Sequence, residues 1–161
     1  MRYLTTALLL LGTNALADSP IQPRSSLPSY KQECAACHTA YPPGLLPAES
    51  WRRMMSTLPK HYGVDASIDD AALLKEISSW LETNAGTYKR AGELTPSNRI
   101  TDATWFERKH SKVNAEVWQR VGIKSKSNCI ACHGGAERGD FDDDSVRIPG
   151  GGGLFNKKSK R

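Results

Sequence analysis

Cys34-Ala35-Ala36-Cys37-His38 is the stretch around which the chain is organised, and its pattern returns at Cys129-Ile130-Ala131-Cys132-His133. Residues three positions apart lie on one face of a helical turn, so two such cysteines can each form a thioether with one vinyl group of a haem. The histidine that follows then places its imidazole under the ring, where it can bind the iron. The repeated C-x-x-C-H pattern therefore predicts two sites of covalent haem attachment, which together use every cysteine of the chain.

The cysteines permit two other interpretations. In an oxidising compartment four cysteines would usually form two disulfides. A single zinc ion could instead bind all four thiolates, those of Cys34, Cys37, Cys129 and Cys132. Neither interpretation explains why a histidine directly follows each cysteine pair, so haem attachment is the one we favour.

The N-terminus has the three parts of a signal peptide. Arg2 supplies a positive charge, residues 7–11 form an apolar run, and Ala15-Leu16-Ala17 matches an A-x-A cleavage site. The alternative is a short transmembrane anchor, but the apolar run is well below the roughly 20 residues that a membrane span needs. We therefore predict that residues 1–17 are cleaved and that the product is exported, with no later membrane span.

The remaining sequence is long enough for one domain with a sizeable core. Residues 18–29 are rich in proline and serine and predict an extended lead-in, whereas residues 150–161 predict a glycine-rich, basic and flexible tail. The flanks of the two motifs do not match well, so duplicated halves are not favoured. Residues 30–149 are predicted to form one domain that contains both haem sites.

Apolar periodicity predicts four helical segments and no strand, hence an all-α fold with long loops. Together with the two attachment motifs, this predicts a small cytochrome c-like domain built around two covalently attached haems. One runs from Tyr30 to His38 and carries the first motif. A second begins near Pro47, is ended by Pro59 and carries the apolar side chains Trp51, Met54, Met55 and Leu58. The third is predicted from Ser67 to Ala85, with Ser67 and Asp70 as a capping box and Gly86 as C-cap. The fourth is predicted to begin at Thr101 and to continue, after a break, to Gly122.

The charge balance limits the choice of partners. The formal net charge is +5, and removal of the signal takes away only Arg2, which leaves 21 basic and 17 acidic residues, or +4. No basic stripe with interleaved aromatic residues is present, so nucleic-acid binding is not predicted. A mild positive charge is suited to solubility and to loose docking against an acidic patch.

The histidine count predicts how the irons are ligated. A c-type haem takes one histidine from its motif and usually a histidine or methionine from elsewhere as the sixth ligand. The motifs use His38 and His133, which leaves His61 and His110 for two irons. Two bis-histidine irons would be low-spin, of low potential and without an open position for a substrate, which favours electron transfer over catalysis.

Alternatives remain for each of these histidines. His61 follows a lysine in a turn and could be a surface residue, and His110 shares a helical face with Phe106 and could belong to the core. Met54 or Met55 could replace either of them as a ligand. The nearest pairing in sequence joins His38 with His61 and His133 with His110, although spacing alone does not exclude a crossed arrangement.

Beyond the motifs, the chain resembles the small dihaem cytochrome c family of bacterial electron carriers over roughly residues 30–149. The resemblance rests on the segments Ala40-Tyr41-Pro42-Pro43-Gly44-Leu45-Leu46-Pro47-Ala48-Glu49-Ser50-Trp51, Leu58-Pro59-Lys60-His61-Tyr62-Gly63-Val64-Asp65-Ala66, Trp105-Phe106-Glu107-Arg108-Lys109-His110 and Val146-Arg147-Ile148-Pro149. It implies a mostly helical fold around two closely spaced bis-histidine haems. His61 and His110 stand where the family's distal ligands are expected.

The resemblance also implies a function. It implies a periplasmic protein that donates electrons to a small monohaem, oxygen-binding c-type cytochrome, sometimes alongside a membrane b-type cytochrome. The competing hypothesis is a dihaem enzyme, either a peroxidase or a reductase of a small oxyanion, with one displaceable axial ligand. The residues after Pro149 lie outside the resemblance.

Overall fold

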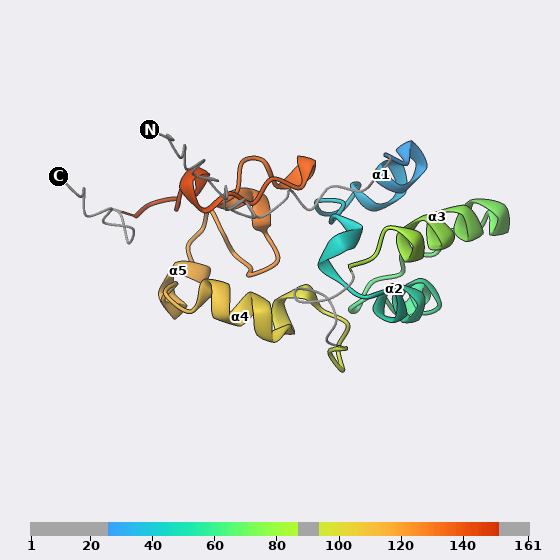
Figure 1. The fold of residues 1–161 in the computed structure, drawn as a ribbon, viewed down its shortest axis with the longest axis horizontal. Helices are drawn as coiled ribbons and strands as arrows, with labels where there is room; N and C mark the ends of the chain where they lie inside the picture. Colours follow the sequence, from blue (N-terminus) through green and yellow to red (C-terminus); the bar gives the residue numbers. More distant parts are fainter. Residues whose placement is uncertain (1–25, 87–93, 152–161) are drawn as a thin grey trace, which may run out of the picture.

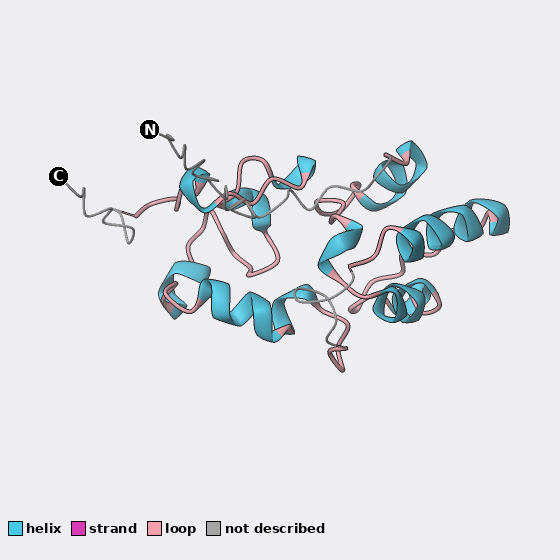
Figure 2. Ribbon diagram, viewed as in Figure 1, coloured by secondary structure: helices cyan, strands magenta, loops and turns pink. Residues whose placement is uncertain are grey.

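The structure, a computed structural model, describes residues 26–86 and 94–151 (Figure 1). Within these ranges the chain forms helices and turns and no strand, apart from an isolated bridge between His61 and Val64 (Figure 2). The prediction of an all-α fold with long loops is therefore confirmed. The predicted signal peptide at 1–17, most of the lead-in and most of the tail lie outside the described residues.

The described residues contain five α-helices, α1 (Pro28–Cys34), α2 (Ala48–Met55), α3 (Ala71–Thr83), α4 (Thr104–His110) and α5 (Ala115–Trp118). The loops contain single turns of 3-10 helix, among them Pro43–Leu45, Leu58–Lys60, Ile100–Asp102 and Cys129–Ala131. None of the helices in the described ranges is long and apolar enough to cross a membrane. Helices α1 to α3 gather at one end of the molecule, and α4, α5 and the later turns gather at the other (Figure 1).

The main core lies in the N-terminal part, residues 26–86, where α2 and α3 pack against each other and α1 contacts α3. Residues four apart on a helix share a face, and both helices present such pairs to the core. The buried members are Tyr30, Leu46, Trp51, Met55, Leu58, Ile77 and Leu81. The predicted stripe is thus confirmed for Trp51 and Met55, with Met54 packed at its margin, but α2 ends at Met55 and Leu58 reaches the core from the following 3-10 turn. Burying each large side chain contributes about 1.5–3 kcal/mol.

Helix α3 is shorter at both ends than predicted. It begins at Ala71 because Asp70, not Ser67, is the N-cap: one oxygen of its carboxylate accepts bonds from the backbone N–H groups of Ala72 at 2.8 Å and Leu73 at 3.1 Å. Ser67 instead donates its backbone N–H to Asp65 in a turn before the helix. At the other end the C-cap is Asn84, and the predicted cap Gly86 donates its N–H to Leu46 O at 2.9 Å.

The Asp70 cap gives a direct test of this helix boundary. Replacing Asp70 with alanine leaves two backbone N–H groups without their partner and should lower the free energy of unfolding by about 1 kcal/mol. Asp69→Ala is the matched control, because Asp69 is exposed, carries the same charge and is not the capping residue. Denaturant unfolding of both variants measures the difference, and equal stabilities would contradict the assignment of the cap.

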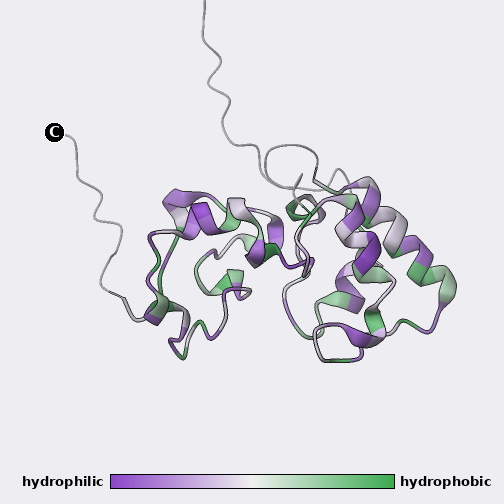
Figure 3. Cartoon of the chain, turned by 90° about the horizontal axis from the view of Figure 1, so that it is seen from below, coloured by the Kyte–Doolittle hydropathy of each residue, from purple (hydrophilic) through white to green (hydrophobic). Residues whose placement is uncertain are grey.

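The C-terminal part, residues 94–151, has shorter helices and a smaller core. Its buried apolar side chains are Ala103, Phe106, Val117, Ile123 and Ala136. The predicted N-cap Thr101 lies instead in the turn Ile100–Asp102, and α4 begins three residues later without a side-chain cap. The predicted continuation to Gly122 is also wrong, because α5 ends at Trp118 and Val121 is 85% exposed. Figure 3 shows both hydrophilic and hydrophobic stretches on the helices of the two parts.

Candidate functional site

The first C-x-x-C-H motif lies at the end of α1. Cys34 is the last helical residue, and the helix stops there, so Cys37 and His38 occupy the turn that follows rather than the predicted longer helix. Cys34 is partly buried and Cys37 is exposed. His38 Nδ1 lies 2.8 Å from the carbonyl oxygen of Thr39. Because a carbonyl only accepts, the proton lies on Nδ1, and Nε2 keeps its lone pair for a metal.

The second motif forms a tight turn without a preceding helix. Its first three residues make the 3-10 turn Cys129–Ala131, and the N–H of His133 donates to Cys129 O at 2.8 Å. The chain returns to the motif near its end, where the N–H of Arg147 donates to Cys132 O at 2.9 Å. The His133 ring meets Phe141 edge-on, with centroids 5.4 Å apart. The motif is therefore fixed by backbone bonds from both sides.

His61 lies beside His38. It follows the single turn Leu58–Lys60 and opens a reversal in which Tyr62 has φ 50° and Gly63 has φ 99°. A φ above zero is costly for most residues, so Gly63 is the natural occupant of the second position. The reversal turns the His61 ring toward the first motif, where its centroid lies 6.1 Å from that of His38 with the ring planes 25° apart.

His110 lies beside His133 in an aromatic environment. It is the last residue of α4, and its Nδ1–H donates to the carbonyl oxygen of Phe106 at 2.9 Å, which again leaves Nε2 available. The Phe106 ring stacks on it at 4.0 Å, and Trp118 lies 5.7 Å away. The centroids of His110 and His133 are 6.2 Å apart, with the planes at 80°.

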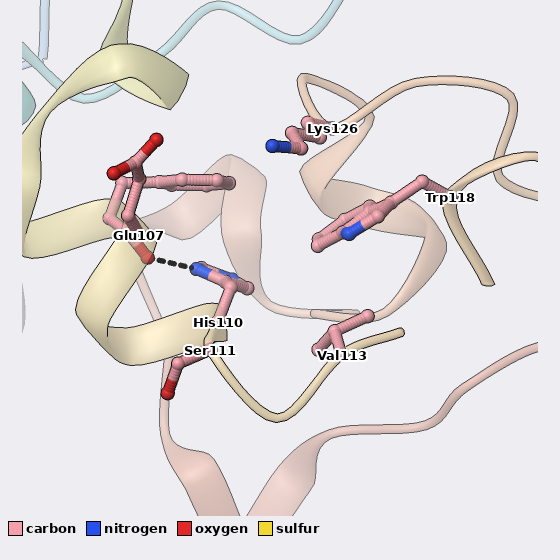
Figure 4. Close-up of a pocket in the computed structure, with 7 residues that line it drawn as sticks. Glu107, His110, Ser111, Val113, Trp118 and Lys126 are labelled. Carbon is pink, nitrogen blue, oxygen red and sulfur yellow. Dashed lines mark hydrogen bonds between the residues drawn. The ribbon is translucent and has the colours of Figure 1, made fainter. Parts of the chain in front are cut away.

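A small cavity of about 210 Å³ opens beside the His110 ring (Figure 4). Figure 4 shows His110 and Trp118 on opposite sides of this space, with the bond from His110 to the helix backbone drawn as a dashed line. The lining residues are Phe106, Glu107, His110, Ser111, Val113, Trp118 and Lys126. Aromatic, polar and charged side chains thus line this space together with the His110 imidazole.

Both histidine pairs have the spacing of two ligands on one iron. An imidazole nitrogen binds a metal at about 2 Å, and the ring centroid lies about 1 Å behind it, so opposed imidazoles have centroids about 6 Å apart. The two pairs, at 6.1 Å and 6.2 Å, match this separation. The structure pairs the histidines that are nearest in sequence, and neither pair is crossed.

The protonation of the rings suits metal binding. Burial lowers the pKa of His61, with smaller contributions from His38 and Arg99. Burial also lowers the pKa of His110 and of His133, which lie against each other. A lower pKa favours the neutral imidazole, and the neutral imidazole is the form that binds a metal.

The cysteines suit thioethers better than zinc. All four thiols are free in the structure. Burial raises the pKa of Cys34 and of Cys129 to about 11, which opposes the thiolate form that zinc requires. Across residues 26–86 and 94–151, no three His, Cys, Asp or Glu side chains gather around a common metal position. A neutral thioether has no such penalty, so these residues fit covalent haem.

A small all-α fold with two C-x-x-C-H motifs, each beside a second histidine, defines a c-type cytochrome with two haems. The chain belongs to the dihaem cytochrome c family, whose sequence model matches residues 30–141. It therefore carries two covalently bound haem c groups. The resemblance seen in the sequence is thereby confirmed.

Solved structures are similar over most of the chain. The crystal structure of DHC purified from Rhodobacter sphaeroides is 44% identical, with a TM-score of 0.62, and the match covers 73% of this chain and 98% of that one. A dihaem cytochrome c from Shewanella baltica is 35% identical, with a TM-score of 0.67, and the match covers 76% and 93% of the two chains. No curated protein sequence matches at a significant level.

The structure adds aromatic residues that the motif analysis did not single out. Tyr41 stacks on His38 with centroids 4.9 Å apart, and Phe141 meets His133. Tyr41 lies only three residues after the first motif, so its position in the sequence could have indicated a contact with the motif. Phe141 follows the second motif in a loop without periodicity, and nothing local in the sequence marks it.

Proposed function

We propose that the protein is an electron carrier in which two low-spin haems, each ligated by two histidines, pass single electrons between redox partners. The observation that carries this proposal is the presence of a second histidine about 6 Å from each motif histidine. Each bound haem supplies a one-electron iron couple. The protein's own contribution is to hold two imidazoles in place at each iron, which leaves no position for a substrate.

The residue roles follow from the two pairs. Cys34 and Cys37 would attach the first haem, with His38 and His61 as its axial ligands. Cys129 and Cys132 would attach the second haem, with His133 and His110 as its axial ligands. The competing ligands Met54 and Met55 pack in or against the core of α1 to α3, which supports histidine instead.

The surroundings of the two pairs support electron transfer rather than catalysis. Phe106 and Trp118 pack beside the His110 ring, so the surroundings of this proposed ligand are partly apolar. An enzyme such as a peroxidase or a small-oxyanion reductase needs an open iron position and an acid or base beside it. Two axial positions filled by histidine at each iron favour an electron carrier over such an enzyme.

We further propose that the protein works in the periplasm. Support comes from the predicted signal peptide at residues 1–17 and from the family resemblance. The partners that the resemblance implies are a monohaem c-type cytochrome and a membrane b-type cytochrome. The net charge of +4 predicted for the mature chain favours an acidic docking surface on the partner.

Mass and spin state test the proposal together. The mature chain should be about 1.2 kDa heavier than its polypeptide, because two thioether-bound haems add this mass. Electron paramagnetic resonance of the oxidised protein should then show two low-spin ferric signals and no high-spin component. A dominant high-spin signal, or rapid carbon monoxide binding by the reduced protein, would favour the enzyme instead.

A further inference from the structure

Tyr41 joins the two haem sites. Its ring stacks on His38, with centroids 4.9 Å and planes 23° apart, and its hydroxyl donates to the carbonyl oxygen of Ser127 at 2.7 Å. The bond connects residues 86 positions apart in sequence. Ser127 lies two residues before Cys129. The Tyr41 side chain therefore contacts both the histidine of the first motif and the segment that leads into the second motif.

The acceptor of this bond is part of the second motif's own structure. The carbonyl oxygen of Ser127 also accepts the backbone N–H of Cys129 at 3.0 Å. A continuous series of contacts therefore runs from the His38 ring through the Tyr41 ring and hydroxyl to the Ser127 carbonyl and the Cys129 amide.

Tyr41 is itself held firmly. Its carbonyl oxygen accepts the hydroxyl of Tyr30 at 2.7 Å, and the buried Tyr30 ring packs on Trp80 of α3 with centroids 5.0 Å apart. The next residue is the buried Pro42, which restricts the backbone of Tyr41 to extended conformations. The side chain is thus anchored in the core of the N-terminal part and reaches the C-terminal part.

We propose that Tyr41 is a positioning residue that holds the two haem sites at a fixed separation and provides a hydrogen-bonded path for electron exchange between them. The inference rests on the proposed function. With haem bound at both sites, one electron would pass from the reduced site to the oxidised site, with no bond broken and no proton transferred. Bonded atoms and hydrogen bonds couple two redox centres better than an empty gap does, so losing the hydroxyl slows this step.

Tyr41→Phe tests the proposal in the mature, haem-loaded protein, because it keeps the ring on His38 and removes the bond to Ser127. We expect electron exchange between the haems, measured after flash reduction of one of them, to slow severalfold, because the hydrogen bond that connects the two sites is lost. The low-spin signals of both haems should keep their positions, since no ligand changes.

Tyr62→Phe is the matched control. Tyr62 also packs against a histidine, His61, and also donates its hydroxyl to a backbone carbonyl, that of Ser97 at 2.9 Å, but this bond does not reach the second motif. The control should exchange electrons at the rate of the unsubstituted protein. An unchanged rate in Tyr41→Phe, or an equal loss in both variants, would overturn the proposal.

A measurement on the unsubstituted protein keeps the proposal testable if Tyr41→Phe fails to mature. Tyr41 contacts both motif regions, so haems bound at the two sites would lie close together and their ferric signals should show magnetic coupling to each other. Uncoupled low-spin signals would overturn the role of Tyr41 and leave the electron carrier intact. A high-spin signal in the same spectrum would instead count against the proposed function.

Discussion

His110→Ala should convert one of the two haems from low spin to high spin and leave the other unchanged. The substitution removes the imidazole that lies 6.2 Å from the His133 ring, and no other histidine of the chain is left to replace it. The iron bound by His133 would then have an open position, while the pair of His38 and His61 stays complete. Electron paramagnetic resonance and carbon monoxide titration should each report half of the haem as altered.

His110→Met is the control for this experiment. Methionine can still ligate iron, so the haem should stay low-spin while its potential rises by on the order of 0.1 V, within the range that axial ligands control. A spectrum in which neither haem responds to His110→Ala would show that His110 is not a ligand. A response of the haem attached at Cys34 and Cys37, in place of the one attached at Cys129 and Cys132, would show that the pairing is not the nearest one.

Replacing both Cys129 and Cys132 with serine should remove one covalent haem and lower the mass of the mature protein by about 0.6 kDa. Serine cannot form a thioether, and Cys34 and Cys37 still serve the first site. We also expect the C-terminal part to lose its helices, because it has few buried apolar side chains of its own. Mass spectrometry and circular dichroism measure the two effects.

The mirror variant, with Cys34 and Cys37 replaced by serine, is the control. It should lose the same mass but keep more helical signal, because the core of α1 to α3 includes Trp51, Ile77 and Leu81 independently of the haem. Retention of two haems in either variant would contradict the attachment sites. An equal loss of helical signal in both variants would contradict the expectation that the N-terminal part depends less on its haem than the C-terminal part does.

Local sequence signals predicted the features that depend on near neighbours. The all-α class and the apolar face of α2 followed from periodicity. Helix ends were predicted less well: Asp70 and Ser67 are both good caps, and only the observed bonds distinguish them. Thr101 failed as a cap because a 3-10 turn and then Ala103 precede α4.

The candidate haem-binding residues were predictable because the chain has only four cysteines and four histidines. Four histidines for two irons gave the candidates for the ligands, and the structure brings them together in pairs. The contacts across the molecule could not be predicted, because Tyr41 and Ser127 are 86 residues apart and neither belongs to a motif. The aromatic surroundings of His110 were predictable in part, since Phe106 lies one helical turn before it.

The short helices of the C-terminal part bear on the order in which the protein is assembled. Helices α4 and α5 have seven and four residues, and helices this short are not stable alone in water. The second motif has no helix before it. We therefore expect haem attachment to precede folding in the C-terminal part. The machinery that joins haem to Cys129 and Cys132 would then act on an unfolded chain. The C-terminal part should become resistant to proteases only after the haem is attached.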